Sequence, residues 1–437
     1  MEISEALRWH DARLDHETTS RGIAAGQVEG LSLQSMRELM ELLGDPQDQV
    51  PVIHITGTNG KGTVAAMVTA LLQAHGLRVG TYTSPHLLRV NERIARDGEP
   101  ISDSELAEVL TGIAAVEPLL ADQPSWFEVI TAAAFRWFAE APVEVAVVEV
   151  GLLGRTDSTN VVNAEVAVVT AIQGDHTDFA AGWELAVATE KAGILKPMST
   201  AVLGEIPEEL VAVFAAEGPA RLLQSGVDFE VLNDRLAIGG HLADIQGVYA
   251  LYNEVFLPVH GRHQVVNAAI SVAAVESFFA RELDPEVIHA AFAEFNLPGR
   301  FEILQHSPLV VIDGAHNPDA LSATALTIEE EFAPVGTRIV VLGALFGRDA
   351  RRLVAAVAEL RPDLVICCSL DGPRGVEGRV LAAACDELGI PQEVVADPGS
   401  ATARALAISA EEDMILVTGS FRVLEPARVA VRQSNGQ

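Results

Sequence analysis

The residues with the clearest chemical potential lie in the stretch TGTNGKGT, from Thr56 to Thr63. It departs from the usual phosphate loop, G-x-x-x-x-G-K-[ST], because its first glycine comes late and Gly62 separates the lysine from the threonine. Glycines let backbone N–H groups surround an anion, and a helix that starts here adds its positive N-terminal end. The strand-like PVIHI before the loop and the helix-like VAAMVTALLQAHG after it favour a nucleotide site over a plain glycine turn. The residues expected to bind the nucleotide are Thr58, Asn59, Gly60, Lys61, Gly62 and Thr63, with Lys61 at the terminal phosphates and the Thr63 hydroxyl near Mg²⁺.

Lysine is unusually scarce in this chain. Of the 29 basic residues, 26 are arginine, and the three lysines are Lys61, Lys191 and Lys196. An amine differs from a guanidinium because it is a compact point charge and can act as a nucleophile. Lys191 lies in ATEKAGILK, where it could form a solvated pair with Glu190 or be a helix-end cation favoured by the dipole. Either role would suit arginine as well, so the lysine at this position calls for another explanation.

Polar side chains also follow several apolar, strand-like runs. Glu149 ends VEVAVVEVG, and a carboxylate in such a run is costly unless a metal or a partner satisfies it. Ser84 in TSPHL, and Asp175 and His176 in QGDHTD, follow two other runs. Each alone could be an ordinary loop residue. Because the carboxyl ends of parallel strands meet at one edge of a sheet, these three ends together with the strand end that carries the phosphate loop favour a Mg²⁺ site there.

The elements that must position these residues form two series. Short apolar runs at 51–55, 78–85, 143–151, 164–172 and 199–205 predict buried parallel strands, with helices expected at 102–120, 126–140, 183–194 and 261–280. Residues 206–258 look like short strands and turns. Pro and Gly in NLPGR, 296–300, predict a domain boundary. Beyond it, strands are expected at 308–314, 338–344, 363–369, 392–397 and 413–419. The predicted architecture is α/β, with two doubly wound domains and a site where strand ends meet.

Composition narrows the possible partners and compartments. A chain of 437 residues is long enough for two or three domains, and its formal net charge of −32 argues against nucleic acid and anionic membranes as main partners. The polar, acidic N-terminal sequence is unlike a signal peptide, and the apolar runs are too short to span a membrane, so we expect a cytoplasmic protein. Three cysteines, two of them adjacent at Cys367 and Cys368, favour buried reduced thiols. No exposed apolar helix stands out, so we expect a monomer.

Ten motifs together resemble one family. TGTNGKGT, SPHL with NERI, SWFEVITAAAF, EVGLLGRTDSTN, DHTDF, EKAGILK, GRHQVVNA, PGRFE, DGAHNP and TGSF occur in the order typical of folylpolyglutamate synthase/dihydrofolate synthase, within the Mur ligase superfamily. The similarity runs from Leu31 to Leu424. A glycine directly after the loop lysine, as in GTNGKGT, is typical of this family. The resemblance implies an N-terminal P-loop ATPase domain with a parallel sheet, residues 1–296, and a smaller C-terminal Rossmann-like domain, residues 301–437. It also implies that the two domains close around ATP and glutamate.

The resemblance further implies an ATP-dependent ligase that joins L-glutamate to a folate or dihydropteroate carboxylate through an acyl phosphate. By motif, the Mg²⁺ ligands would be Thr63, Ser84, Glu149, His176 and Lys191, with Lys191 carbamylated and holding a second Mg²⁺. A guanidinium could not form this adduct. Asn267, Arg300 and Asp313 would contact ATP, and Asp313, His316 and Ser420 the incoming glutamate, with Lys61, Lys191 and His316 as the catalytic groups. From the residues alone, Asn267 could instead bridge helices, and Arg300 could form an ion pair at the domain boundary.

The chain departs from the family pattern in three places. Leu153 replaces the second glycine of EVGLGGR, Ala180-Ala181 replace Leu-Gly, and Gly347-Arg348-Asp349 replace Asp-Lys-Asp. A peptidoglycan Mur ligase is the rival within the class, but such enzymes carry a UDP-sugar domain ahead of the loop, and only 56 residues precede Gly57 here. The other rival is a nucleotide-dependent binding protein or a ligase that no longer turns over. We expect polyglutamylation, with dihydrofolate synthesis as a second activity.

Overall fold

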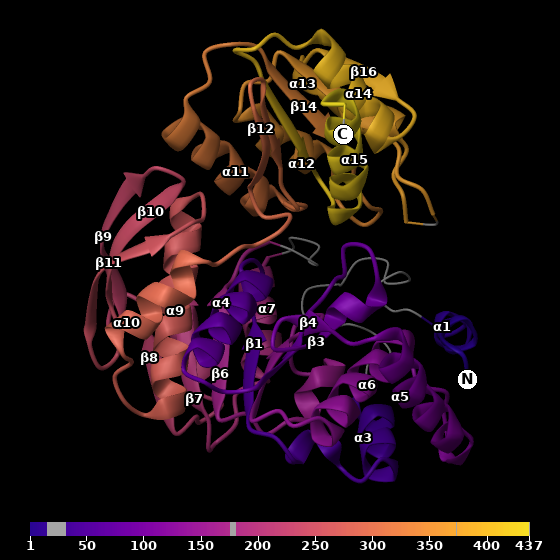
Figure 1. Cartoon of the computed structure of the whole chain (residues 1–437), viewed down its shortest axis with the longest axis vertical. Coiled ribbons are helices and arrows are strands. Elements are labelled where there is room, and N and C mark those ends of the chain that lie inside the picture. The colour runs from indigo at the N-terminus through magenta and orange to yellow at the C-terminus, as the bar shows by residue number, and fades with distance from the viewer. Residues whose placement is uncertain (15–31, 175–180, 373, 437) are drawn as a thin grey trace. The chain divides into compact units, whose positions relative to one another are not determined.

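The computed structural model describes residues 1–14, 32–174, 181–372 and 374–436. The chain forms two compact units. The first comprises Met1–Pro258 and Gln264–Phe295, and the second comprises Val259–His263 and Asn296–Gln437. The segment Val259–His263 therefore belongs to the second unit, although Gln264–Phe295, which follow it in the chain, belong to the first. Figure 1 labels many of the elements of both units.

Among the described residues, the N-terminal unit contains an eight-stranded sheet in the order β4-β3-β2-β5-β1-β6-β7-β8. Its central strands consist mostly of apolar, largely β-branched residues and are buried, as expected for parallel strands covered on both faces. The six parallel strands are β1 (Val52–Thr56), β2 (Val79–Tyr82), β5 (Val145–Glu149), β6 (Val166–Ala171), β7 (Thr200–Glu205) and β8 (Arg221–Gln224). The short strands β3 (Ile94–Arg96) and β4 (Glu99–Pro100) continue the sheet in antiparallel pairing, which the apolar pattern did not predict.

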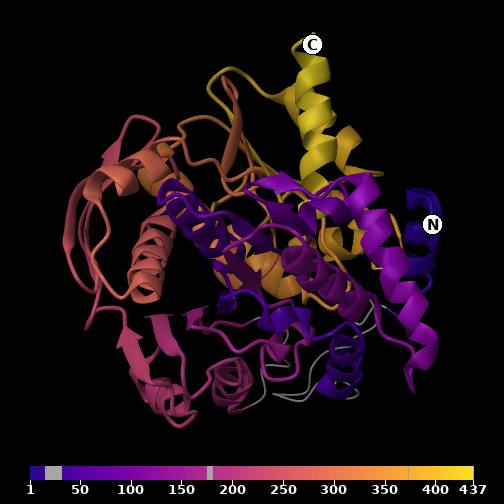
Figure 2. The ribbon, with the colours of Figure 1, turned by 60° about the horizontal axis from the view of Figure 1, so that its bottom comes forward.

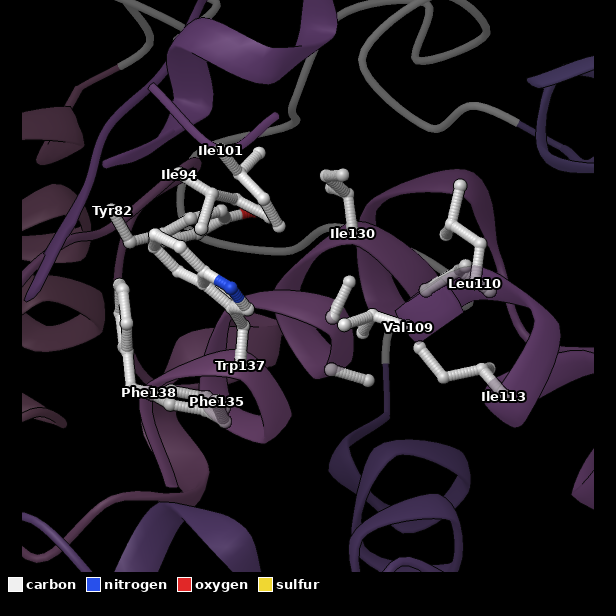
Figure 3. Close-up of a cluster of buried hydrophobic side chains, with 14 of the residues drawn as sticks. Tyr82, Ile94, Ile101, Val109, Leu110, Ile113, Ile130, Phe135, Trp137 and Phe138 are labelled. Atoms are coloured by element: carbon white, nitrogen blue, oxygen red, sulfur yellow. The ribbon is translucent and has the colours of Figure 1, made fainter. Parts of the chain in front are cut away.

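The helices of this unit begin where the sequence offers caps. Ser102 and Ser125 each form a capping box, with Glu105 and Glu128 respectively, which satisfies backbone N–H groups of the first turn. The helices are α1 (Ile3–Asp11), α3 (Leu33–Leu42), α4 (Lys61–Ala74), α5 (Asp103–Val116), α6 (Trp126–Glu140), α7 (Trp183–Ala192), α8 (Glu208–Ala215), α9 (Arg262–Phe279) and α10 (Pro285–Ala293). Figure 3 shows part of this apolar core, with Trp137 of α6 on the side of Tyr82 of β2 and Leu110 of α5 on the opposite side of the cluster.

The stretch expected to hold short strands and turns forms a separate antiparallel sheet. Its order is β11-β10-β9, with β9 (Glu230–Ala237), β10 (Gly240–Gln246) and β11 (Leu251–Leu257). Both views show this sheet beside α9 and α10 (Figures 1 and 2). Glu276 of α9 is fully buried and accepts hydrogen bonds from the Tyr252 hydroxyl, at 2.6 Å, and from the backbone N–H of Val248. A buried carboxylate thus anchors α9 to this sheet, and burial raises its pKa.

The C-terminal unit contains, among its described residues, a six-stranded sheet in the order β12-β13-β17-β14-β15-β16. Apart from β12 (Glu302–His306), which is antiparallel, the strands are parallel: β13 (Leu309–Ile312), β14 (Arg338–Leu342), β15 (Leu364–Cys368), β16 (Gln392–Val395) and β17 (Met414–Thr418). The helices are α11 (Pro318–Thr327), α12 (Ala350–Ala358), α13 (Gly378–Leu388), α14 (Pro398–Ile408) and α15 (Leu424–Ser434). Because β17 lies beside β13, the residues that follow these two strands meet at one edge.

The α/β class predicted from the sequence is confirmed in both units. Cys367, Cys368 and Cys385 are buried free thiols, as expected. In the described part of the chain, no helix has the length and apolar character needed to cross a membrane.

Candidate active site

The phosphate loop connects β1 to α4 and depends on glycine at two positions. Gly57 has a φ of 147° and Gly60 a φ of 86°, a region that favours glycine. A Cβ on Gly57 would lie 1.8 Å from the Thr170 hydroxyl, and one on Gly60 would lie 2.7 Å from Asn267 Oδ1. The loop is therefore enclosed by β6 on one side and α9 on the other.

Thr58 and Asn59 hold the loop to the end of β6 through a residue that the sequence analysis missed. The Thr58 hydroxyl donates to the Gln173 carbonyl (3.1 Å) and accepts from the Gln173 N–H (3.0 Å). The side chain of Asn59 donates to Gln173 Oε1 at 2.7 Å. Gln173 thus binds both residues, and its place directly after a strand was the signal that could have identified it.

The two lysines of the site meet at one carbonyl oxygen. Lys61 Nζ donates to the carbonyls of Gly57 and Thr58, both at 3.0 Å, and Lys191 Nζ donates to the same Gly57 carbonyl at 2.7 Å. Lys191 is 4% exposed, which contradicts the solvated pair with Glu190. Burial, and then the nearby charge of Lys61, lower the pKa of Lys191 well below its ordinary value, while Asp157 opposes this shift.

The predicted metal edge is formed by neighbouring parallel strands. In the order β2-β5-β1-β6, the carboxyl ends carry Ser84, Glu149 and the phosphate loop. Glu149 is 2% exposed and accepts a hydrogen bond from the Ser84 N–H at 3.0 Å, and Thr63 is buried in the first turn of α4. Asp175 and His176 lie outside the described residues.

The chemistry of these side chains fits Mg²⁺. The groups at the edge are a carboxylate and two hydroxyls, hard oxygen donors that suit this ion when phosphates complete its coordination. Among the residues that the structure describes, no three His, Cys, Asp or Glu side chains cluster as a metal site.

The loop that follows Glu149 explains one departure from the family pattern. Leu153, at the position of the family's second glycine, has a φ of 59° and therefore adopts the left-handed conformation that glycine tolerates best. Its side chain is 5% exposed, and its carbonyl accepts a hydrogen bond from the Thr56 hydroxyl at 2.5 Å. This loop thus accommodates leucine at a left-handed position.

Asn267 of α9 reaches the phosphate loop. It is 7% exposed; its Nδ2 donates to Gln264 Oε1 at 2.9 Å, and its Oδ1 faces Gly60. Gln264 was not singled out from the sequence, although it lies in the same GRHQVVNA motif. The contact of Asn267 with the loop favours a role at the nucleotide over a bridge between helices.

In the C-terminal unit, Asp313 organises the residues around it. Its carboxylate accepts hydrogen bonds from the N–H of Phe301 (2.6 Å), the N–H of Ala315 (2.7 Å) and the Thr324 hydroxyl (3.2 Å). These bonds tie the segment of Arg300 to the loop of His316. Asp313 is 8% exposed.

One aromatic ring brings the other predicted residues of this unit together. The Arg300 guanidinium carbon lies 4.4 Å from the centroid of Phe421, and the His316 ring centroid lies 6.0 Å from it. His316 Nδ1 lies 2.8 Å from the Gly314 carbonyl, so Nδ1 is the donor. Ser420, which precedes Phe421, is 2% exposed and accepts from the Arg422 N–H at 3.2 Å. Phe421 was part of the TGSF motif but was not predicted as a site residue.

The last departure from the family pattern lies between β14 and α12. Asp349 is the N-cap of α12 and accepts from the N–H of Arg351 and Arg352. Burial, together with the charge of Arg374, lowers the pKa of Arg348 to about 10. The segment thus keeps a cation where the family has lysine.

Comparisons with known proteins identify the family of this chain. The Mur ligase middle domain matches residues 127–275, and the Mur ligase glutamate ligase domain matches residues 299–421. The chain is 39% identical to the dihydrofolate synthase/folylpolyglutamate synthase of Mycobacterium tuberculosis, over 89% of this chain and 81% of that protein. It is 34% identical to the Escherichia coli protein of the same name, over 88% of each.

Solved structures give the same result. The M. tuberculosis folylpolyglutamate synthase complexed with ADP is similar with a TM-score of 0.90 and 36% identity, over 98% of each chain. E. coli FolC in complex with DHPP and ADP is similar with a TM-score of 0.86 and 28% identity, over 100% of this chain and 99% of that one. The extent of these matches, with the same domains in the same order, shows that the chain belongs to the dihydrofolate synthase/folylpolyglutamate synthase family of Mur ligases.

Proposed function

We propose that this protein is an ATP-dependent ligase that adds L-glutamate to the carboxylate of a folate, and of dihydropteroate as a second acceptor. The observation that carries the proposal is the meeting of Lys61 and Lys191 at the Gly57 carbonyl, with Asn267 beside Gly60. This places two amines and a carboxamide around a loop built to bind phosphate. The names of the relatives supply the class of acceptor.

The reaction would use ATP to activate a carboxylate. An oxygen of the acceptor carboxylate attacks the γ-phosphorus, and ADP leaves, which gives an acyl phosphate. The glutamate amine then attacks the acyl carbon; phosphate leaves, and the nitrogen loses a proton to give the amide. Positioning of the reactants and neutralisation of phosphate charge are the main contributions of the protein.

Each unit would supply part of this chemistry. We assign residues 1–296 to ATP and 301–437 to glutamate. Lys61 would contact the terminal phosphates, and Thr63, Ser84, Glu149 and His176 would hold Mg²⁺, which neutralises charge on the phosphates.

The C-terminal residues divide into contacting and positioning groups. Arg300, held against Phe421, would meet ATP, while His316 and Ser420 would meet glutamate. The sequence predicts that Asp313 contacts ATP and glutamate directly. The three hydrogen bonds that its carboxylate already accepts favour a role in positioning Arg300 and His316.

Lys191 would act as a carbamate. CO₂ adds to an uncharged amine, which loses a proton as the carbamate forms. The burial of Lys191 lowers its pKa and so favours the uncharged form. The added carboxylate would hold a second Mg²⁺ beside Glu149. We expect Lys191→Arg to fold but be nearly inactive, because a guanidinium forms no such adduct. We expect Lys191→Ala to be partly rescued by a short carboxylic acid. Near wild-type turnover of Lys191→Arg would contradict the carbamate.

The test of the function is phosphate release from ATP, measured with L-glutamate and with dihydropteroate or tetrahydrofolate in parallel. We expect release that requires both glutamate and an acceptor, with a product one glutamate heavier by mass spectrometry. A UDP-linked muropeptide is the control acceptor and should be inert. Glutamylation of neither pterin acceptor would refute the substrate assignment. Sedimentation should show a monomer.

A further inference from the structure

The third lysine of the chain, Lys196, has no role in the chemistry described above. Its Nζ donates to Asn160 Oδ1 at 2.9 Å and lies 3.4 Å from the Gly193 carbonyl. It thus lies just after α7, the helix that carries Lys191, and reaches back to a loop that follows β5.

Asn160 is the centre of the contact. It is 4% exposed, and its Nδ2 donates to the Arg155 carbonyl at 2.9 Å and to the Gly193 carbonyl at 3.0 Å. With Lys196 bound to Oδ1, its carboxamide makes three hydrogen bonds. Arg155 belongs to the loop that begins at Glu149, and Gly193 directly follows α7. One side chain therefore joins the segment of Glu149 to the segment of Lys191.

The backbones of the two segments are also in direct contact. The Arg155 backbone N–H donates to the Glu190 carbonyl at 2.8 Å. A Cβ on Gly154 would lie 2.8 Å from the Glu190 carbonyl and 3.0 Å from Lys191 Cα, and one on Gly193 would lie 2.6 Å from Arg155 Cα. Glycine at positions 154 and 193 permits this close approach of the two segments. The hydrogen bonds of the Asn160 carboxamide fix the position of the Arg155 segment along the Gly193 segment.

We propose that Asn160 and Lys196 are positioning residues that hold Lys191 in register with Glu149 and so set the spacing of the Mg²⁺ ligands. This inference rests on the proposed roles of Lys191 and Glu149. This role also explains why residue 196 is a lysine. The compact ammonium of Lys196 can donate to Asn160 Oδ1 and approach the Gly193 carbonyl, whereas the planar guanidinium of an arginine directs its donors along fixed axes.

The test is the Mg²⁺ dependence of nucleotide binding and of turnover. We would compare Asn160→Ala, which removes all three hydrogen bonds of the carboxamide, with Lys196→Met, which removes the ammonium. Asn163→Ala is the matched control, because Asn163 is exposed and lies three residues further on. Binding of the ATP analogue AMPPNP is measured by calorimetry at increasing Mg²⁺ concentration, and turnover and the KM for glutamate are measured alongside.

We expect Asn160→Ala to raise the Mg²⁺ concentration at half-maximal AMPPNP binding by about tenfold, the lower end of what loss of an outer-shell partner costs at a metal site. Turnover should fall by a similar factor, while the KM for glutamate stays within about twofold. Lys196→Met should show a smaller effect in the same direction, and adding it to Asn160→Ala should change little, because both act on one contact. Asn163→Ala should match the wild type.

An unchanged Mg²⁺ dependence of AMPPNP binding in folded Asn160→Ala would overturn the proposal. If that variant does not fold, an unchanged dependence in Lys196→Met would overturn it equally. Wild-type phosphate release with folate and glutamate tests the proposed function separately, so the two can fail independently. A uniform loss of stability with no shift in Mg²⁺ dependence would mean that the contact is merely structural, which also contradicts the proposal.

Discussion

Leu153 allows a quantitative test of how the loop behind Glu149 is built. Two terms oppose each other at this residue. The left-handed conformation costs a non-glycine residue about 1–2 kcal/mol. The side chain, 5% exposed, packs in a core with Val169, Ala188 and Ile194, and truncating a buried leucine to alanine costs about 2–5 kcal/mol.

Replacement by alanine and by glycine separates these terms. Leu153→Ala loses the buried side chain and keeps the strain, so we expect a loss of about 3 kcal/mol in the free energy of unfolding. Leu153→Gly loses the same packing but relieves the strain, so it should be about 1 kcal/mol more stable than the alanine variant. At ordinary positions the order is reversed, with glycine about 0.5–1 kcal/mol less stable than alanine. Leu152, which does not have a positive φ, is the control and should show that ordinary order.

Urea unfolding followed by tryptophan fluorescence is a suitable assay. The four tryptophans, at positions 9, 126, 137 and 183, all belong to the N-terminal unit, so the signal reports the unit that contains Leu153. An alanine variant as stable as the glycine variant at position 153 would refute the reasoning. So would the same order of stability at positions 152 and 153.

Three further predictions concern the loop, the N-terminal core and the C-terminal unit. Gly57→Ala should abolish nucleotide binding by calorimetry, because its Cβ would lie 1.8 Å from the Thr170 hydroxyl; measurable ATP binding at wild-type affinity would contradict this. Burial lowers the pKa of His10 from 6.5 to about 4, so its contribution to stability is present above pH 6.5 and is lost as the pH falls towards 4. Over that range the free energy of unfolding of the wild type should fall by about 3 kcal/mol more than that of His10→Phe, which keeps a ring against Trp126. Urea unfolding at each pH measures this difference, and parallel pH profiles of the two proteins would exclude His10 as the cause. His316→Ala should lower turnover far more than ATP affinity, because the phosphate loop lies in the other unit; lost ATP binding with unchanged turnover at saturation would reverse that assignment.

Much of the fold follows from local sequence. Apolar β-branched runs such as residues 52–56 and 145–149 form buried strands where their pattern places them, because the pattern itself reports burial on both faces. The loop at Gly57 and Gly60 could likewise be identified from its glycine pattern, since few other residues adopt the φ values that the loop needs. The antiparallel strand β3 was not predicted, because its short sequence carries no distinct periodicity.

The sequence by itself determined the strand–loop–helix unit, the choice of glycine in the loop and the unusual retention of lysine at three positions, because each is a property of neighbouring residues. Only the tertiary structure decided that Lys191 reaches the Gly57 carbonyl, 134 residues away in the chain. It also decided that Gln173 holds the loop, that Phe421 joins Arg300 to His316, and that Asn160 joins two segments. These contacts depend on the order of strands in each sheet, which brings distant segments together and which local periodicity does not encode.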